Sequence, residues 1–64
     1  MAYPFQAQTN KNADLFIAGE PTITVAKGTV ITVENERGTN GEVSVTLNGQ
    51  KKRGTMDKAD YDAV

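Results

Sequence analysis

A chain of 64 residues that contains neither cysteine nor histidine must fold without the usual supports of a small domain, a disulfide or a structural zinc ion. Only carboxylate and carbonyl oxygens remain as metal ligands, and these suit calcium or magnesium rather than a zinc site that drives folding. Leu, Ile, Val and Phe make up 13 of the 64 residues, so the apolar core is small. We therefore expect one domain that gains stability by associating with copies of itself or with a larger assembly.

The clearest structural signal is the alternation of β-branched and polar residues in two segments, 22–26 and 29–35. The side chains on one parity are apolar, namely Ile23, Val25, Ile31 and Val33, and those on the other parity include Thr24, Thr32 and Glu34, where only Val30 breaks the polar face. A period of two is typical of a strand with one buried face. Lys27-Gly28 separates the two segments, and it indicates either a turn or a bend in one long strand.

Two hairpins are predicted in the second half of the chain. A polar connection leads to an alternating segment, 42–47, which Asn48-Gly49 then ends. Asn-Gly is the dipeptide that a two-residue type I′ turn prefers, because both central positions need positive φ. The return segment, 50–55, would place Lys52 across from Val45, which predicts a polar edge strand protected by its charges.

Two further segments complete the predicted fold. The apolar run Leu15-Phe16-Ile17 is closed by a turn at residues 19–21, and we expect a short strand there. The last segment, 56–64, fits either a helical turn capped by Asp57 or a closing strand, and the sequence alone leaves both open. The segments together predict an all-β fold, a small antiparallel five-stranded barrel or sandwich.

The first twelve residues differ from the rest of the chain, because Tyr3 and Phe5 are the only large apolar groups in a polar, Gln- and Asn-rich segment. This composition predicts an extended N-terminal arm over residues 1–12, followed by a single β domain over residues 13–64. Aromatic residues in a polar terminus suggest two anchors that dock across the arm's own domain or onto a neighbour. The alternative is a frayed end.

Two resemblances agree with an all-β fold. From Gly28 to the end, the two hairpins, a short turn and a final apolar residue resemble an SH3-like small β-barrel, although the chain has no aromatic ligand-binding cluster at the expected loops. The whole chain, rich in Thr, Asn, Gly and Val, is similar in composition to small bacteriophage virion accessory proteins. The first resemblance implies a fold only, and the second implies a structural role in a capsid, decoration or tail.

The residue types give little basis for catalysis. The only serine, Ser44, falls in mid-strand, and no histidine is present to activate it. Asp57, Asp60 and Asp62 lack the alternating donors and central glycine of a calcium loop, so we interpret them as a solvated terminus. We expect no catalytic residue, no metal site and no cofactor.

One charge cluster, Lys51, Lys52 and Arg53, forms a basic hairpin able to contact phosphate or an acidic partner. Single-strand binding normally adds aromatic stacking platforms, but the chain has only four aromatic residues and a pI of about 5.1. The leading hypothesis is therefore a non-enzymatic assembly subunit that docks through Tyr3 and Phe5. The alternative is a regulatory or nucleic-acid-binding small barrel that uses the basic hairpin.

The location of the protein follows from segments that the sequence lacks. Met1 to Ala18 has no basic start followed by an apolar run, and no stretch approaches about 18 apolar residues. We expect neither a signal peptide nor a membrane span, and hence a soluble intracellular protein, with the virion as a further location.

Overall fold

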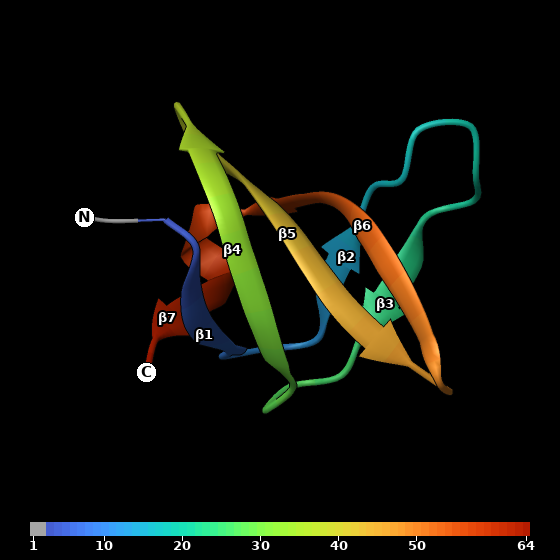
Figure 1. The fold of residues 1–64 in the computed structure, drawn as a ribbon, viewed down its shortest axis with the longest axis horizontal. Helices are drawn as coiled ribbons and strands as arrows, with labels where there is room; N and C mark the ends of the chain where they lie inside the picture. The colour runs from blue at the N-terminus through green and yellow to red at the C-terminus, as the bar shows by residue number, and fades with distance from the viewer. Residues whose placement is uncertain (1–2) are drawn as a thin grey trace.

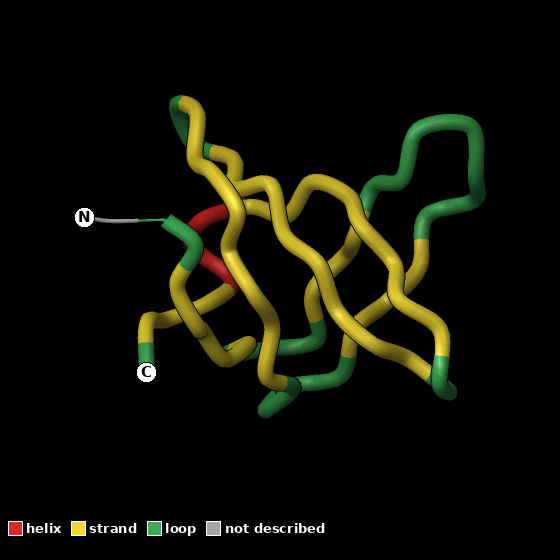
Figure 2. The backbone as a smooth tube through the Cα atoms, in the orientation of Figure 1, coloured by secondary structure: helices red, strands yellow, loops and turns green. Residues whose placement is uncertain are grey.

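The computed structural model describes residues 3–64, which form two antiparallel β-sheets (Figures 1 and 2). The main sheet has five strands in the order β6-β5-β4-β1-β7, and the second sheet pairs β2 with β3. The all-β fold with a five-stranded antiparallel sheet is confirmed, but the barrel is not closed, because β6 and β7 are opposite edges of the main sheet. The elements are β1 (Phe5–Thr9), β2 (Ala13–Leu15), β3 (Ile23–Val25), β4 (Val30–Arg37), β5 (Asn40–Leu47), β6 (Gln50–Asp57), the 3-10 turn η1 (Lys58–Asp60) and β7 (Tyr61–Ala63).

The predicted N-terminal arm is wrong between Phe5 and Thr9, because these residues form β1 inside the main sheet. β1 pairs with β4 on one side and with β7 on the other. Its inward positions hold Phe5, Ala7 and Thr9, whereas its two glutamines are exposed. Small inward residues let the strand lie close to the core, but they give a weak hydrophobic signal in the sequence. Met1 and Ala2 of the predicted arm lie outside the described residues.

The predicted hairpin turn at Asn48-Gly49 is confirmed. Both residues have positive φ, 52° and 77°, and Leu47 pairs with Gln50 across the turn. Lys52 pairs with Val45, as the register of the hairpin predicts, and β6 is an edge strand of the main sheet. Three consecutive basic residues on this edge oppose pairing with another positively charged strand.

Both sheets contribute to one hydrophobic core. Alternate residues of each strand point inward, so β2 and β3 cover the inner face of the main sheet. Tyr61 of the last strand closes one end of this core. The buried apolar residues are Ala7, Ala13, Leu15, Val25, Ile31, Val33, Val43, Val45, Met56 and Tyr61.

A single backbone bridge joins the second sheet to the edge of the main sheet. The Phe16 amide donates to the Thr55 carbonyl at 2.9 Å, and the Thr55 amide donates to the Phe16 carbonyl at 2.8 Å. Gly54 lies directly against the Phe16 carbonyl group, where a side chain at this position would collide with backbone atoms. The expected strand at residues 15–17 is therefore shifted toward Ala13, and it continues only as this bridge.

The last segment combines the two structures that the sequence leaves open. Asp57 caps η1 by accepting a hydrogen bond of 3.0 Å from the Ala59 amide, and β7 then pairs with β1. Between β3 and β4, Gly28 has a φ of 86°, so Lys27-Gly28 forms a turn rather than a bend in one strand. Within residues 3–64, no helix is long and apolar enough to cross a membrane.

Replacing Gly54 with alanine tests the junction between the sheets. The added methyl group collides with the Phe16 carbonyl group, so we expect a loss of about 1–3 kcal/mol in the free energy of unfolding by denaturant. Gln50→Ala, at an exposed position of the same strand, is the control and should change stability by less than about 0.5 kcal/mol. Equal stability of the two variants would contradict the close approach of the sheets at Gly54.

Candidate functional site

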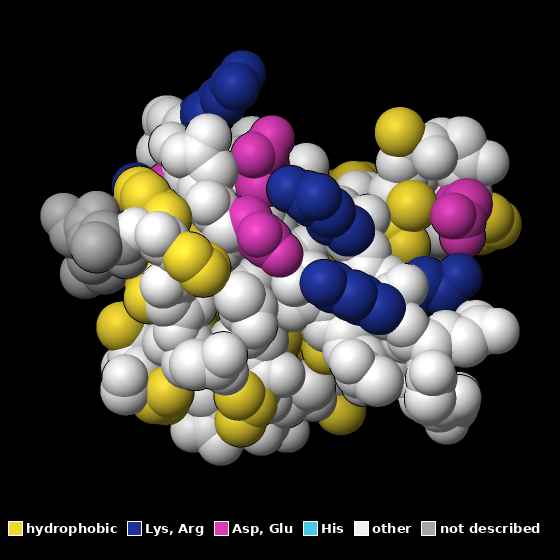
Figure 3. Space-filling model, in the orientation of Figure 1, with side chains coloured by type: hydrophobic (Ala, Val, Ile, Leu, Met, Phe, Trp, Pro, Cys, Tyr) yellow, Lys and Arg dark blue, Asp and Glu magenta, His cyan; other side chains and the backbone are white. Residues whose placement is uncertain are grey.

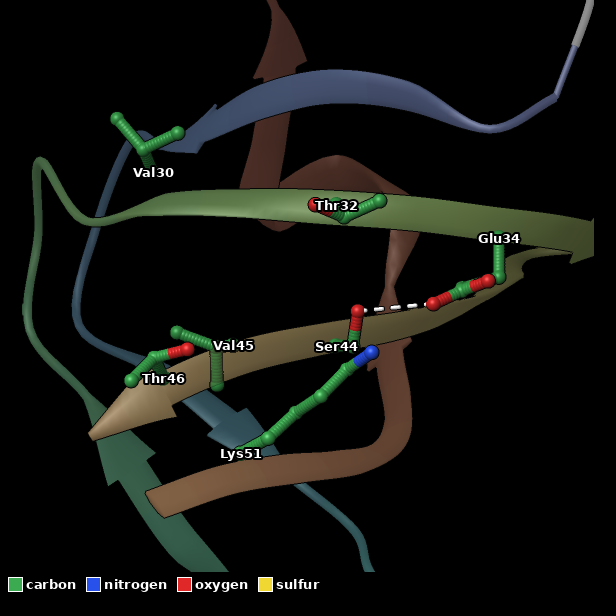
Figure 4. A pocket seen from close by; sticks show the side chains of 7 residues that line it. All are labelled: Val30, Thr32, Glu34, Ser44, Val45, Thr46 and Lys51. Carbon is green, nitrogen blue, oxygen red and sulfur yellow. Dashed lines mark hydrogen bonds between the residues drawn. The ribbon is translucent and has the colours of Figure 1, made fainter. Parts of the chain in front are cut away.

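The outer face of the main sheet contains a shallow groove of about 370 Å³ (Figure 4). Hydroxyl groups dominate its floor, with one carboxylate and one ammonium group at its sides. The Lys51 side chain extends from β6 toward Ser44 on β5. The lining residues are Val30, Thr32, Glu34, Ser44, Val45, Thr46 and Lys51.

Ser44 and Glu34 form a partly buried hydrogen bond in this groove. The Ser44 hydroxyl donates to Glu34 Oε2 at 2.9 Å, and Ser44 is only 5% exposed. A carboxylate accepts hydrogen bonds but is too weak a base to deprotonate a hydroxyl group at neutral pH. The contact therefore satisfies a buried hydroxyl group and gives no basis for nucleophilic catalysis.

The structure separates the three basic residues that the sequence groups together. Lys51 and Arg53 pair with Thr46 and Ser44, so both lie on the outer face, where basic and acidic side chains gather (Figure 3). Within the described part of the chain, neither forms an ion pair. Lys52 lies on the opposite side and contacts Glu20 at 3.3 Å, so only two of the three cations are available on one surface.

A second polar cluster lies at one end of the core, around the Glu36 carboxylate. A β-bulge between Val33 and Asn35 shifts the register by one residue, which turns Glu36 toward the inner face opposite Gly41. The Tyr61 hydroxyl donates to Glu36 Oε2 at 2.6 Å, and the Tyr3 hydroxyl donates to Oε1 at 2.8 Å. A side chain at Gly41 would occupy the place of the Tyr61 hydroxyl.

The electrostatics of this cluster follow from its hydrogen bonds. Donation from Tyr61 and Tyr3 holds the pKa of the Glu36 carboxyl below its ordinary value of 4.5. Burial, reinforced by the bond to Glu36, raises the pKa of the Tyr61 phenol well above 10.0. The hydrogen bond to Glu36 likewise raises the pKa of Tyr3. Both phenols therefore stay protonated and the carboxylate stays ionised, which makes the cluster a structural clamp at neutral pH.

The two predicted arm anchors are both used within their own domain. Phe5 packs against the core and pairs with Val33 of β4. Tyr3 is 42% exposed, but its hydroxyl is held by Glu36 and its ring lies 5.7 Å from that of Phe5 between centroids. Of the two docking modes expected for the arm, the described contacts match docking across its own domain.

Phe16 is the most exposed aromatic side chain among the described residues. Its side chain is 57% exposed, although its amide and carbonyl groups are both bonded to Thr55. It begins the loop over residues 16–22, which projects from the body of the molecule between β2 and β3 (Figures 1 and 2). Sequence reasoning placed Phe16 inside a short apolar strand. The turn Gly19-Glu20-Pro21, which follows this apolar segment, is the sequence feature that indicates that the segment ends at the surface.

Two further findings concern the site. Among the residues that the structure describes, no three His, Cys, Asp or Glu side chains gather in a way that could hold a metal ion. Comparison with known proteins finds no family model, no curated protein and no solved structure that matches this chain.

The clamp around Glu36 predicts a specific dependence of stability on pH. Because the folded-state pKa of Glu36 is lowered, its contribution is complete above about pH 4.5 and is lost as the pH falls below that value. In Glu36→Gln, we expect a lower melting temperature at neutral pH and a smaller further drop between about pH 6 and pH 3 than in the wild type.

Glu42→Gln provides the matched control, because the described residues show no side-chain hydrogen bond to Glu42 and it lies on the adjacent strand β5. Its melting temperature should follow the wild-type pH profile more closely than that of Glu36→Gln. Identical acid profiles for Glu36→Gln and the wild type would show that the two phenols do not stabilise the ionised carboxylate.

Proposed function

We propose that the chain is a non-enzymatic assembly subunit that associates with copies of itself as part of a larger structure. The observation that supports this most directly is Phe16, a large aromatic side chain held in solvent by a rigid backbone bridge. Exposed aromatic side chains on a fixed scaffold are typical binding anchors, because they bury a large area and lose little conformational entropy on binding. The composition of the sequence favours a virion as the larger structure.

The size of the molecule supports the same proposal. The chain has a mass of 6.9 kDa and a core built mainly from Val, Ala and Ile side chains. Domains of this size often gain stability from association. A net charge of −1 also gives little electrostatic repulsion between copies.

We propose further that the fold is SH3-like. The two hairpins, the turn η1 and the closing strand β7 follow one another in the order that this resemblance implies. A shared fold does not imply a shared function, so assembly is inferred from the exposed side chains and not from the fold.

Substitution of Phe16 tests the assembly function. In Phe16→Ser, we expect a folded chain by circular dichroism, because the ring is outside the buried core, and a self-association constant weakened by about tenfold or more. The measurement is the mass in solution by light scattering over a range of concentrations.

Val30→Ser is the matched control, since Val30 is 56% exposed but lies on the outer face of the main sheet, away from the loop. It should associate like the wild type. If Phe16→Ser retains the wild-type association, Phe16 is not an anchor.

A second candidate function is contact with phosphate groups through Lys51 and Arg53. It is favoured by their position on one face without an intramolecular ion pair in the described part of the chain. Glu34 in the adjacent groove weakens the positive field, which is why this function ranks second.

The basic face predicts a difference between two charge reversals. The double variant Lys51→Glu and Arg53→Glu should lose binding to a single-stranded oligonucleotide at low salt, measured by fluorescence anisotropy. Lys52→Glu should retain most of it, because Lys52 already contacts Glu20. With two phosphate contacts, the logarithm of affinity should fall with the logarithm of salt concentration with a slope of about −1.4. Absence of binding by the wild-type chain would eliminate this candidate.

A further inference from the structure

The edge strands of the two sheets differ in their charge. In the main sheet, β6 carries three basic residues and β7 carries Asp62. In the second sheet, β2 lies against β6 at the Phe16 bridge, which leaves β3 paired on one side only. β3 and its flanks, residues 21–26, contain no charged side chain. Charged residues are the usual protection of a strand edge, so β3 is the least protected edge in the described part of the chain.

The side chains of β3 also suit pairing with another strand. Ile23, Thr24 and Val25 are all β-branched, with Val25 buried and Thr24 exposed on the opposite face. Thr24 pairs with Asp14 on β2, and the other edge of β3 has no strand partner among the described residues. A strand added there would extend the two-stranded sheet without displacing any core residue.

We propose that β3 pairs antiparallel with β3 of a second copy, which gives a continuous four-stranded sheet across a two-fold axis. This inference rests on the proposed self-association and assigns it a surface. A two-fold axis between these antiparallel strands runs perpendicular to the sheet. One residue of β3 must therefore lie directly opposite the same residue of the second copy. At the centre of β3 that residue is Thr24, and Ile23 then pairs with the partner's Val25, which keeps both cores on one side.

Charge complementarity favours a second copy of this chain over an unrelated strand. The uncharged run is bracketed by Glu20 at one end and Lys27 at the other. Antiparallel self-pairing centred on Thr24 brings Glu20 to within about one residue of the partner's Lys27, and the same contact is repeated by symmetry. Glu20 contacts Lys52, but its side chain remains 50% exposed and accessible to a second cation. Self-pairing of β6, in contrast, would place like charges opposite each other.

Phe16 follows β2, one strand away from the proposed contact between the two β3 strands, which we call the β3 seam. By the alternation of β2, its ring is on the same face as Asp14 and hence as Thr24. The Phe16 rings of the two copies thus lie on the same face of the joined sheet, one on each side of the β3 seam. Because β3 has only three residues, pairing supplies few backbone hydrogen bonds, and we expect a weak, concentration-dependent dimer rather than a permanent one.

Charge substitutions at Thr24 test the proposed register. Thr24→Lys and Thr24→Glu each place like charges opposite each other across the two-fold axis, so each variant alone should have a dimer dissociation constant at least about tenfold above that of the wild type. An equimolar mixture should regain association, because lysine then faces glutamate. Thr46→Lys, at an exposed position of β5 in the main sheet, is the control and should dimerise like the wild type.

Sedimentation equilibrium gives the masses, and circular dichroism on the same samples shows that each variant is folded. Wild-type association that persists in Thr24→Lys overturns the β3 seam but leaves the proposed self-association intact. Weakened single variants that fail to associate when mixed overturn the register centred on Thr24. A wild-type chain that is monomeric at every concentration overturns the self-association and this inference with it.

Discussion

The main sheet depends on the pairing of β1 along both of its edges. β1 is the only strand that joins the β6-β5-β4 half of the described sheet to β7, so without it the last strand has no neighbour. The fully buried Ala7 allows this close fit. The Thr9 hydroxyl donates to the Ala26 carbonyl at 2.8 Å and accepts from the Thr29 amide at 2.9 Å, which holds the turn between β3 and β4. β1 therefore contributes to the core of the domain and is not available as a docking arm, so docking requires other surfaces.

Most of the second half of the fold could be predicted from the sequence, because its signals are local. Asn48-Gly49 determines the turn between β5 and β6, and the alternation of Val43 and Val45 determines which face is buried. β1 escaped prediction for a physical reason. Its two fully inward residues, Ala7 and Thr9, are small or polar, and their burial depends on strands more than twenty residues away in the sequence, so the local residue pattern does not indicate a strand.

The surface sites were predictable only in part. The basic residues of β6 are evident in the sequence, but the alternation of the strand divides them between two faces, which leaves Lys51 and Arg53 together and turns Lys52 toward Glu20. The clamp at Glu36 depends on a one-residue bulge. Such a bulge moves the side chains that follow it to the opposite face of the sheet, and the sequence pattern does not indicate where it occurs. Exposure of Phe16 likewise depends on a long-range bridge.

Self-association of this small domain is the proposal on which the other surfaces depend, and it is tested by the mass of the unmodified chain in solution as its concentration is varied. We expect a mass above 6.9 kDa at high concentration that approaches the monomer value on dilution. A β-rich circular dichroism spectrum should persist in the monomer, because the described core is complete within one chain. A constant mass of 6.9 kDa over the whole range of concentrations would show that the chain does not associate with itself.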